Sequence, residues 1–400
     1  MAARKKLTKA ERIEDLLTRG VVDVVDRENL ERALRSGKKL RVKLGFDPTG
    51  AKIHIGRAII LRKLKAFQDL GHQVVFIVGD FTARVGDPSD KLGKRPMLDA
   101  SAIKENLKRY KAQIGKIIDL EKAEFHYNSR WLSKLTFGEI AELAESFSVQ
   151  QMVARRNFKE RWEKGEEISL RELLYPLMQG YDSVAVKADL ELGGTDQLFN
   201  LHAGRVIQRF YGQKEQDLLT TEMLEGTDGR KMSTSWGNVI NITDEPSEIF
   251  GKIMSIRDEL IGRYLALTTE LPLEEVRLIE VGMAKGMTNP RDAKLRLARE
   301  VVTLYHGEGV GEKAEEEFIS VFRKGELPEN LQTVQPKKGE TVVEFMVRAK
   351  LARSKGEAAR LVEQGGVSLS DERVSDPHLA VEKFSGAVIR VGKRHFVRIG

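Results

Sequence analysis

Cysteine is missing from this chain: none of its 400 residues is Cys. The absence excludes disulfides, thiolate catalysis and any zinc site built on Cys. It leaves seven scattered histidines as soft metal ligands, and neither an HExxH motif nor a Cys/His cluster is present. We therefore expect no tightly bound metal site in the protein.

Long apolar runs are missing as well. No stretch has the roughly 18 consecutive apolar residues that a membrane-spanning helix needs. The N-terminal MAARKKLTKAERIEDLL also lacks the apolar stretch and the small residues of a secretory signal. We expect a cytoplasmic protein with no membrane partner. At about 100 to 200 residues per domain, the chain is long enough for two or three globular units.

Positive charge is in modest excess, and its placement is uneven. The formal net charge is +7, and residues 341–400 hold 11 Lys and Arg against 7 Asp and Glu. A local basic surplus favours a polyanionic partner. A merely solvated basic face is the alternative.

Residues 40–81 have the pattern of a β-α-β unit. LRVKL (40–44) alternates apolar and charged residues, and VVFIVGDF (74–81) is a short run rich in β-branched residues. Between them, AIILRKLKAFQDL (58–70) spaces its apolar side chains as a helix does and ends at Gly71. Strands joined through a helix form parallel sheets covered on both faces, so we predict an α/β fold.

A second region of this kind follows a mainly helical stretch at about 95–175. VAVKADLELGG (184–194) predicts a strand, and residues 197–211 predict the helix after it. Beyond residue 245 the chain turns to charged amphipathic helices punctuated by Pro and Gly. The polar stretch LPENLQTVQPKKGE (327–340) has two prolines and no helical periodicity, which is typical of a linker.

We therefore expect an α/β domain with a helical insertion, then a polar loop with an α-helical domain, a linker and a small α+β domain. These segments span residues 1–225, 226–330, 331–340 and 341–400.

The connection GFDPTGAKIHIGR (45–57) joins the first strand to its helix. A glycine-rich turn here puts backbone N–H groups and a helix N-terminus beside the sheet edge, which is a natural anion site. His54 and Thr49 can donate hydrogen bonds to phosphate oxygens, and Gly56 allows a nucleotide to approach the backbone. An ordinary β-α turn with an incidental histidine is the alternative.

The stretch GTDGRKMSTSWGN (226–238) is a polar loop that carries Lys231. A mobile loop of this composition can bring a lysine onto a polyphosphate and withdraw it again, stabilising charge where it develops. An exposed basic loop without such a role is the alternative.

Taken together, HIGR (54–57) and KMSTS (231–235) resemble the HIGH and KMSKS signatures of class I aminoacyl-tRNA synthetases. The resemblance implies a Rossmann-like fold that binds ATP and activates an amino acid as its adenylate. It implies catalytic roles for His54, Thr49 and Lys231. The residues that it implies for ATP binding are Gly45, Asp47, His54, Gly56, Arg57, Gly194, Asp196, Lys231, Met232, Ser233 and Ser235.

The segment YPLMQGYDSVAVKADLELGGTDQLFN (175–200) bears on the identity of the amino acid. Tyr175, Gln179 and Asp182 have the spacing of one helix face, and the flanking residues are largely apolar. A polar stripe on a buried helix needs partners or lines a cavity. A solvated stripe is the alternative.

This pattern, with GGTDQ after it and GDPSD at 86–90, resembles the tyrosyl-tRNA synthetase signature. The resemblance implies that Asp87, Tyr175 and Gln179 bind the substrate ammonium, and that Asp182 accepts a hydrogen bond from the phenol hydroxyl. A buried carboxylate is left unpaired when phenylalanine enters such a slot, which gives a physical reason for selecting tyrosine.

The same resemblance extends to the rest of the adenylate. It implies that Asp196 holds the ribose and that Gln197 contacts the tyrosyl end.

Residues 342–399 form the third piece of the pattern. Amphipathic helices with basic side chains lead through Gly365 and Gly366 to the β-rich VIRVGKRHFVRI. Basic side chains on a small rigid module suit phosphate contacts on a folded RNA. The stretch resembles the S-four type RNA-binding module of many bacterial tyrosyl enzymes, and a solvated basic face is the alternative. The predicted RNA contacts are Arg348, Lys350, Arg353, Lys355 and Arg360.

Three positions depart from the commonest family pattern. Arg57 replaces the second His of HIGH and still offers donors to phosphate. Thr234 replaces the second Lys of KMSKS, so the loop brings one lysine. Lys43 stands where many relatives have a tyrosine against the substrate phenol.

The reaction implied by the resemblance uses L-tyrosine, ATP with Mg2+, and tRNA(Tyr), and it needs no covalent enzyme intermediate. A homodimer is implied by the resemblance alone. A tryptophanyl enzyme shares the catalytic fold, but the C-terminal module and the Tyr175 helix face speak against it. A non-catalytic RNA-binding relative is the other alternative, and the retained His54, Asp182 and GGTDQ oppose it.

Overall fold

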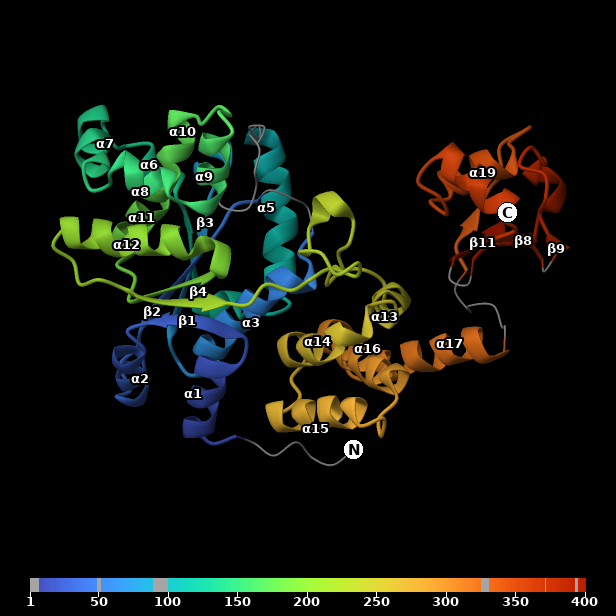
Figure 1. Cartoon of the computed structure of the whole chain (residues 1–400), viewed down its shortest axis with the longest axis horizontal. Helices are drawn as coiled ribbons and strands as arrows, with labels where there is room; N and C mark the ends of the chain where they lie inside the picture. The colour runs from blue at the N-terminus through green and yellow to red at the C-terminus, as the bar shows by residue number, and fades with distance from the viewer. Residues whose placement is uncertain (1–6, 49–51, 89–99, 325–330, 371, 393–394) are drawn as a thin grey trace. The chain divides into compact units, whose positions relative to one another are not determined.

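A six-stranded sheet forms the centre of the first of two units, which comprises residues 1–244 and 255–301 (Figure 1). The computed structural model describes residues 7–48, 52–88, 100–324, 331–370, 372–392 and 395–400. The strand order is β1-β6-β5-β2-β3-β4, in which β1 is antiparallel to β6 and the other neighbours are parallel. The strands are β1 (Val21–Val25), β2 (Arg41–Phe46), β3 (Gln73–Val78), β4 (Ala123–Tyr127), β5 (Leu190–Gly194) and β6 (Asp217–Thr221).

Helices cover both faces of this sheet, which is why its strands β3, β5 and β6 are buried along most of their length. Helix α3 packs on β2, β3 and β5, and helix α12 packs on β5 and β6 and against α11. Figure 1 shows α11 and α12 on one side of the strands and α3 on the other. The helices of this unit are α1 (Lys9–Thr18), α2 (Arg27–Arg35), α3 (Ile55–Asp69), α4 (Thr82–Val85), α5 (Ala100–Ile114), α6 (Ser129–Leu132), α7 (Phe137–Ala144), α8 (Val149–Val153), α9 (Arg156–Glu163), α10 (Leu170–Leu173), α11 (Tyr175–Val186), α12 (Leu198–Phe210), α14 (Ile261–Thr268) and α15 (Leu273–Ala284).

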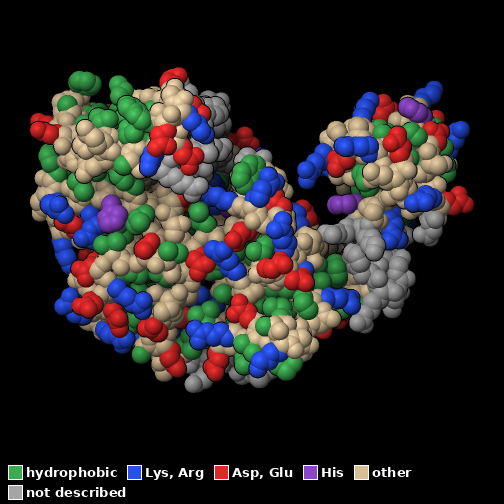
Figure 2. All heavy atoms as spheres, in the orientation of Figure 1, with side chains coloured by type: hydrophobic (Ala, Val, Ile, Leu, Met, Phe, Trp, Pro, Cys, Tyr) green, Lys and Arg blue, Asp and Glu red, His purple; other side chains and the backbone are tan. Residues whose placement is uncertain are grey.

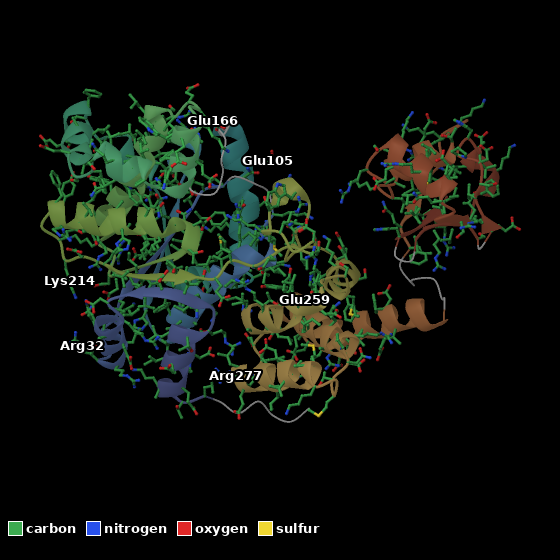
Figure 3. The ribbon with its side chains drawn as sticks, viewed as in Figure 1. Arg32, Glu105, Glu166, Lys214, Glu259 and Arg277 are labelled. Atoms are coloured by element: carbon green, nitrogen blue, oxygen red, sulfur yellow. The ribbon has the colours of Figure 1, made fainter. Side chains whose placement is uncertain are left out.

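Charged side chains are spread over the outside of this unit (Figure 2). Arg32, Lys214 and Arg277 are exposed and project outward from it (Figure 3). No helix in the described part of the chain has the length and apolar character to cross a membrane.

The predicted β-α-β unit is confirmed as β2, α3 and β3, which lie within a few residues of the expected bounds. The strand expected at 184–194 is shorter, because its first residues complete α11. That helix ends at Val186, and Lys187 adopts a left-handed conformation with φ 51° before β5 begins. The helix expected at 197–211 is α12.

The stretch 95–175 was expected to be mainly helical, and its described residues mostly are, but they also contain the strand β4, which was not predicted. This strand pairs in parallel with β3 and forms the edge of the sheet. Its sequence AEFHY mixes polar and aromatic residues, because an edge strand is only half covered. The apolar pattern that marks a central parallel strand is therefore absent.

The second unit comprises residues 245–254 and 302–400. Its helices α13 (Pro246–Met254) and α17 (Val310–Lys324) pack together, and the rings of Phe250 and Phe318 lie 5.2 Å apart. Helix α16 (Pro290–His306) contributes residues to both units. The helices of the predicted domain 226–330 are thus divided between the two units.

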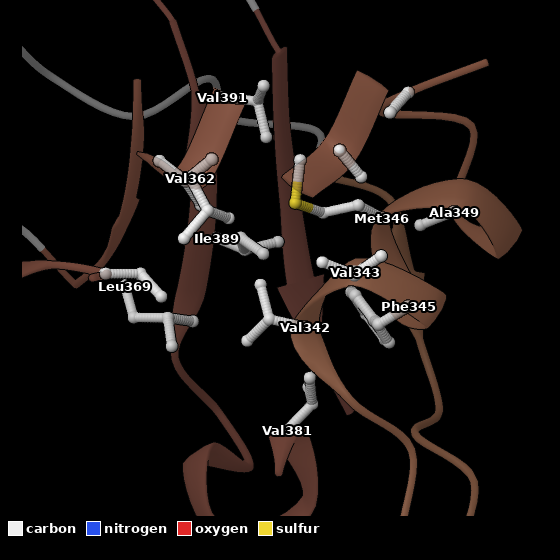
Figure 4. Close-up of a cluster of buried hydrophobic side chains, with 14 of the residues drawn as sticks. Val342, Val343, Phe345, Met346, Ala349, Val362, Leu369, Val381, Ile389 and Val391 are labelled. Atoms are coloured by element: carbon white, nitrogen blue, oxygen red, sulfur yellow. The ribbon is translucent and has the colours of Figure 1, made fainter. Parts of the chain in front are cut away.

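The C-terminal module has a five-stranded sheet of order β7-β11-β10-β8-β9. Val342, Phe345 and Met346 of α18 meet Ile389 of the sheet in its buried core (Figure 4). The elements are β7 (Thr333–Val334), α18 (Val342–Arg348), α19 (Lys355–Glu363), β8 (Val367–Leu369), β9 (Glu372–Arg373), β10 (Val388–Val391) and β11 (His395–Ile399).

Strand β7 corrects the expectation that 331–340 is a linker. It pairs in parallel with β11, with Thr333 opposite Arg398. A strand of two residues is too short to carry an alternating pattern, and the neighbouring prolines favoured a loop interpretation. The segment belongs to the C-terminal module.

Candidate active site

The candidate residues gather where the parallel strands end. Asp47 follows β2, Thr82 follows β3, Asn128 follows β4, and Asp196 follows β5. Because carboxyl ends of parallel strands lie at one edge of the sheet, these residues lie at the edge where open α/β sheets bind their ligands.

His54 is the N-cap of α3 and lies buried at the start of that helix. Its Nδ1 accepts a hydrogen bond from the backbone N–H of Arg57 at 3.3 Å. Burial, reinforced by the positive charges of Arg57 and Lys231, lowers the pKa of His54 to about 3. The imidazole is therefore neutral at physiological pH. Since Nδ1 is the acceptor, Nε2 carries the hydrogen and can donate.

The structure brings the two predicted signature motifs together. Ile55 donates its backbone N–H to the carbonyl of Ile240 at 2.8 Å, and His54 forms a β-bridge with Asn241. A Cβ added at Gly56 would lie 3.3 Å from the sulfur of Met232. Glycine at position 56 thus allows the close approach of the second motif.

Lys231 extends over Asp196, and its Nζ lies 3.2 Å from Asp196 Oδ2. The loop that carries it is held by Asn238, whose Nδ2 donates to the carbonyl of Lys231 and to Asp228. Asn238 Oδ1 in turn accepts from the backbone N–H of Ser233. These bonds explain the buried position of Asn238, the last residue of the stretch 226–238, for which the sequence predicted no role of its own.

Asp182 is the most deeply enclosed carboxylate of the candidate tyrosine pocket, at 3 % exposure. Trp131 Nε1 donates to its Oδ1 at 2.7 Å, and Asn128 Nδ2 donates to its Oδ2 at 3.2 Å. Burial raises the pKa of Asp182 to about 7, while Lys43 and these two donors oppose the rise. Sequence reasoning missed Trp131 and Asn128, because they lie in a stretch without a motif.

Tyr175 lies on the same helix and is hydrogen-bonded to Asp47. Its hydroxyl donates to Asp47 Oδ2 at 2.9 Å, and Thr82 Oγ1 donates to Asp47 Oδ1 at 2.7 Å. Burial and the negative charges of Asp47 and Asp87 raise the pKa of Tyr175, so its phenol stays protonated. Asp47, which the resemblance assigned to ATP, is therefore hydrogen-bonded to a residue that the resemblance assigned to tyrosine binding.

Asp87 and Gln197, which the resemblance assigned separately to the substrate ammonium and to the tyrosyl end, are hydrogen-bonded to each other. Gln197 Nε2 donates to Asp87 Oδ2 at 2.7 Å. Behind them, Asn200 Nδ2 donates to Gln197 Oε1 at 3.0 Å, and Arg155 donates to Asn200 Oδ1 at 3.1 Å. The guanidinium of Arg155 lies 4.6 Å from the ring centroid of Phe199. This series of hydrogen bonds fixes the amide of Gln197 with its donor end toward Asp87.

Arg57, the last residue of the HIGR motif, contacts two aromatic side chains. It donates to the hydroxyl of Tyr110 at 2.8 Å and lies over the ring of Phe46, 5.1 Å from the centroid. Both contacts hold the guanidinium against α5 and β2.

The surroundings of the remaining predicted residues differ from one to the next. A Cβ at Gly194 would lie 2.7 Å from Asp196 Oδ1, whereas one at Gly45 would meet nothing within 4 Å. Thr49 and the side chain of Ser235 lie outside the described residues. Among the residues described, no group of three or more His, Asp or Glu side chains could hold a metal ion.

The predicted RNA contacts of the C-terminal module differ in their surroundings. Arg348 is paired through Nε and Nη2 with the buried Glu340, with the shorter contact at 2.5 Å. Lys355 is paired with Glu344 at 2.8 Å. Lys350, Arg353 and Arg360 are exposed, and Arg360 Nε bonds the carbonyl of Gly356.

Family comparisons agree with this geometry. The family described as "tRNA synthetases class I (W and Y)" matches residues 35–323, and the "Tyrosine--tRNA ligase SYY-like C-terminal domain" matches residues 324–399. The tyrosine--tRNA ligase of Thermotoga maritima is 47% identical over 385 residues, which cover 96% of each chain. That of Dehalococcoides mccartyi is 47% identical over 388 residues, 96% of this chain and 98% of its own.

Among solved structures, the C-terminally truncated mitochondrial tyrosyl-tRNA synthetase of Coccidioides posadasii has a similar fold. The TM-score is 0.60 at 25% identity, and the match covers 78% of this chain and 92% of that one. The matches to both curated relatives cover 96% of this chain. The chain therefore belongs to the tyrosyl-tRNA synthetases, the class I ligases that attach tyrosine to tRNA.

Proposed function

We propose that this chain activates L-tyrosine with ATP at the carboxyl ends of β2, β3 and β5, and then transfers the tyrosyl group to the 3′-terminal adenosine of tRNA(Tyr). One observation carries the proposal: Asp182 is a buried carboxylate with two fixed donors, on the helix face that also bears Tyr175 and Gln179.

Asp182 is the proposed acceptor for the phenol hydroxyl. The donors Trp131 and Asn128 occupy one lone pair on each of its oxygens and hold the carboxylate in a single orientation. A phenol hydroxyl satisfies a remaining lone pair. Phenylalanine would leave it unpaired in a site closed to water, which costs about 1–3 kcal/mol or more for a charged group.

Asp87, Tyr175 and Gln179 are the proposed ligands of the substrate ammonium, and Gln197 contacts the tyrosyl end. Because the Tyr175 hydroxyl donates its hydrogen to Asp47, its oxygen is left as an acceptor. An ammonium group has three hydrogens and no lone pair, so it needs acceptors of this kind.

The substrate carboxylate then attacks the α-phosphorus of ATP, the bond to pyrophosphate breaks, and pyrophosphate leaves with the Mg2+ that entered with ATP. Catalysis consists of positioning and charge stabilisation. His54 Nε2, Lys231 Nζ and Thr49 are the proposed donors to the phosphate oxygens. The neutral state of His54 suits this role, since the ring donates without adding a charge.

Asp196 links nucleotide binding to the Lys231 loop. In the structure Lys231 Nζ contacts Asp196, which is the proposed ribose ligand. Ribose hydroxyls donating to that carboxylate would free Lys231 to turn toward the phosphates. The backbone of Gly45, Gly56 and Gly194, with Arg57, Met232, Ser233 and Ser235, completes the proposed ATP site.

We also infer that the chain forms a homodimer through the surface over α7 to α10. Four large apolar side chains are exposed on these helices and next to them, with Phe137 at 88% and Leu170 at 79%. The other two are Val149 and Trp162. Figure 2 shows hydrophobic side chains gathered over α7 and α10, and patches of this kind mark protein interfaces. Sedimentation should give twice the chain mass, and Leu170→Glu should give a monomer; a monomeric parent protein would contradict the inference.

The tRNA contact is proposed for Lys350, Arg353 and Arg360 of the C-terminal module, with Lys355 and Arg348 held partly by acidic partners. Because tRNA is aminoacylated in the cytoplasm, we place the enzyme there.

ATP–pyrophosphate exchange tests the activation step. The purified protein is given Mg2+, ATP, labelled pyrophosphate and one amino acid at a time, without tRNA. Exchange that depends on tyrosine alone is the expected result. Exchange with tryptophan would overturn the assignment of Asp182, and no exchange with any amino acid would favour a non-catalytic RNA-binding relative.

A further inference from the structure

A fully buried ion pair lies beneath α11, outside the set of proposed substrate ligands. Lys43 of β2 and Glu191 of β5 are cross-strand neighbours in the parallel sheet. Their side chains are 0% and 1% exposed, and Lys43 Nζ lies 2.9 Å from Glu191 Oε1. Isolated charges are costly to bury, so a pair this deep needs every polar atom satisfied.

Lys43 uses all of its donors within the protein. Its ammonium donates to Glu191, to the backbone carbonyl of Gln179 at 2.9 Å and to Ser183 Oγ at 2.8 Å. Three donors meet three acceptors. No hydrogen of Lys43 is left for a substrate phenol, so this residue is not a substrate ligand, although relatives with tyrosine at this position could use it so.

Glu191 accepts hydrogen bonds from two side chains of α11 and from Gln216, which directly precedes β6. Its Oε1 accepts from Gln179 Nε2 at 3.1 Å, and its Oε2 accepts from Ser183 Oγ at 3.1 Å and from Gln216 Nε2 at 2.5 Å. Gly204 makes room for this arrangement, since a Cβ there would lie 2.4 Å from Gln216 Nε2.

The contact to Gln179 has a chemical consequence. A side-chain amide has a donor end and an acceptor end, and which end faces a given neighbour decides what it can bind. An ionised carboxylate accepts only, so it must face the Nε2 end. Gln179 Oε1 is thereby turned away from Glu191 and left as an acceptor.

We infer that the Lys43–Glu191 pair is a positioning device that sets the amide of Gln179 so that Oε1 accepts from the substrate ammonium. The inference rests on the proposed function, because it needs Gln179 to be an ammonium ligand. Glu191 fixes the side chain, and Lys43 fixes the backbone carbonyl of the same residue. The pair therefore holds Gln179 at both ends.

Lys43 also lowers the free-energy cost of burying the carboxylate of Glu191. Glu191 alone would place a second negative charge near Asp182, and like charges in a buried site disfavour ionisation. Lys43 offsets that repulsion, because its charge acts on Asp182 in the opposite sense to that of Glu191. The pair supplies an obligatory acceptor for Gln179 without adding net charge to the pocket.

Two double variants separate the acceptor from the charges. In Lys43→Met/Glu191→Leu both charges are removed together with the acceptor for Gln179 Nε2. In the matched control Lys43→Met/Glu191→Gln both charges are removed, but an amide oxygen remains for Gln179. Neither variant leaves a buried charge unpaired, and replacing a whole buried pair by neutral groups is often well tolerated.

The readout is the affinity for two ligands, measured by calorimetry. Tyramine has the phenol and the ammonium, whereas 3-(4-hydroxyphenyl)propionate has the phenol and no ammonium. We expect Lys43→Met/Glu191→Leu to weaken tyramine roughly ten-fold, as for the loss of one hydrogen bond to a charged group. Its affinity for the propionate should be essentially unchanged, and the control should bind both ligands nearly as the parent protein does.

Equal losses for both ligands in the leucine variant would overturn the inference, because they would show a structural role only. Unchanged tyramine affinity in that variant would overturn it as well. Failure of the parent protein to bind tyrosine at all would instead refute the proposed function. If the leucine variant does not fold, Gln179→Leu keeps the pair intact and must still show the selective loss of tyramine; an equal loss of the propionate there would be decisive against the assignment.

Discussion

Replacing Trp131 by phenylalanine isolates one donor to the carboxylate that is proposed to select tyrosine. The indole Nε1 donates to Asp182 Oδ1 at 2.7 Å, and Asn128 supplies the longer bond of 3.2 Å. Phenylalanine keeps an aromatic ring and removes the N–H. A hydrogen bond to a charged group contributes about 1.5–3 kcal/mol, so we expect the KM for tyrosine to rise by about ten-fold to a hundred-fold, with a smaller change in kcat.

The pH dependence gives an independent readout of the same bond. Burial raises the pKa of Asp182 to about 7, and the Trp131 donor opposes that rise. Binding of the phenol hydroxyl needs the ionised carboxylate, so tyrosine affinity should fall as pH decreases through the pKa. Because about 1.4 kcal/mol corresponds to one pH unit, the midpoint should move upward by about one to two pH units in the variant.

ATP–pyrophosphate exchange at several pH values measures both quantities. Trp162→Phe is the matched control, because Trp162 is 62% exposed on the proposed dimer surface, outside the tyrosine site, and phenylalanine keeps that surface apolar. It should leave the KM for tyrosine and the midpoint unchanged. A Trp131→Phe enzyme with the parent KM and the parent midpoint would refute the reasoning, and so would a loss confined to kcat.

Three further predictions follow from contacts outside that pocket. Lys231→Ala should lower the adenylation rate by orders of magnitude, since a charge on the transferring phosphates is lost, while tyrosine affinity measured by equilibrium dialysis stays nearly intact; equal losses in both would argue against the loop assignment. Arg353→Ala should weaken tRNA binding in a filter assay and reduce its salt dependence. Arg348→Ala should mainly lower the melting temperature of the C-terminal module, because the buried Glu340 loses its ion-pair partner. The reverse pattern would contradict both assignments. Lys63 is buried, and its pKa is lowered from 10.5 to about 7. Between these pH values the folded protein binds fewer protons than the unfolded chain, so the free energy of unfolding should rise with pH relative to that of Lys63→Met. Urea unfolding that gives both proteins the same pH dependence of this free energy would contradict the prediction.

Parts of the fold were predictable because they depend on local sequence. The β2-α3-β3 unit combines a strand, an uninterrupted amphipathic helix and a β-branched run, and each signal is complete within a few residues. The strands β4 and β7 were not predicted, because an edge strand and a strand of two residues owe their existence to a partner elsewhere in the chain. Neither sequence has enough alternating apolar residues to predict a strand.

The candidate site likewise has residues that the sequence predicted and residues that only the fold revealed. His54, Lys231, Tyr175, Gln179 and Asp182 could be proposed from the sequence, because each lies in a motif whose spacing has a direct chemical meaning. The partners that orient them were not found, because Trp131 and Asn128 lie about fifty residues from Asp182 in sequence and meet it only when β4 joins the sheet.

Sequence alone thus determined the fold class, the family resemblance and the chemical groups available for the reaction, since these depend on residue types at short and fixed spacings. Tertiary structure decided how those groups are oriented and charged. The neutral state of His54, the raised pKa of Asp182 and the direction of the Gln179 amide all result from burial and from contacts between distant segments. Lys43 illustrates the difference: in the sequence it is a departure from a familiar pattern, and in the folded protein it is half of a buried pair, because only the sheet register sets it beside Glu191.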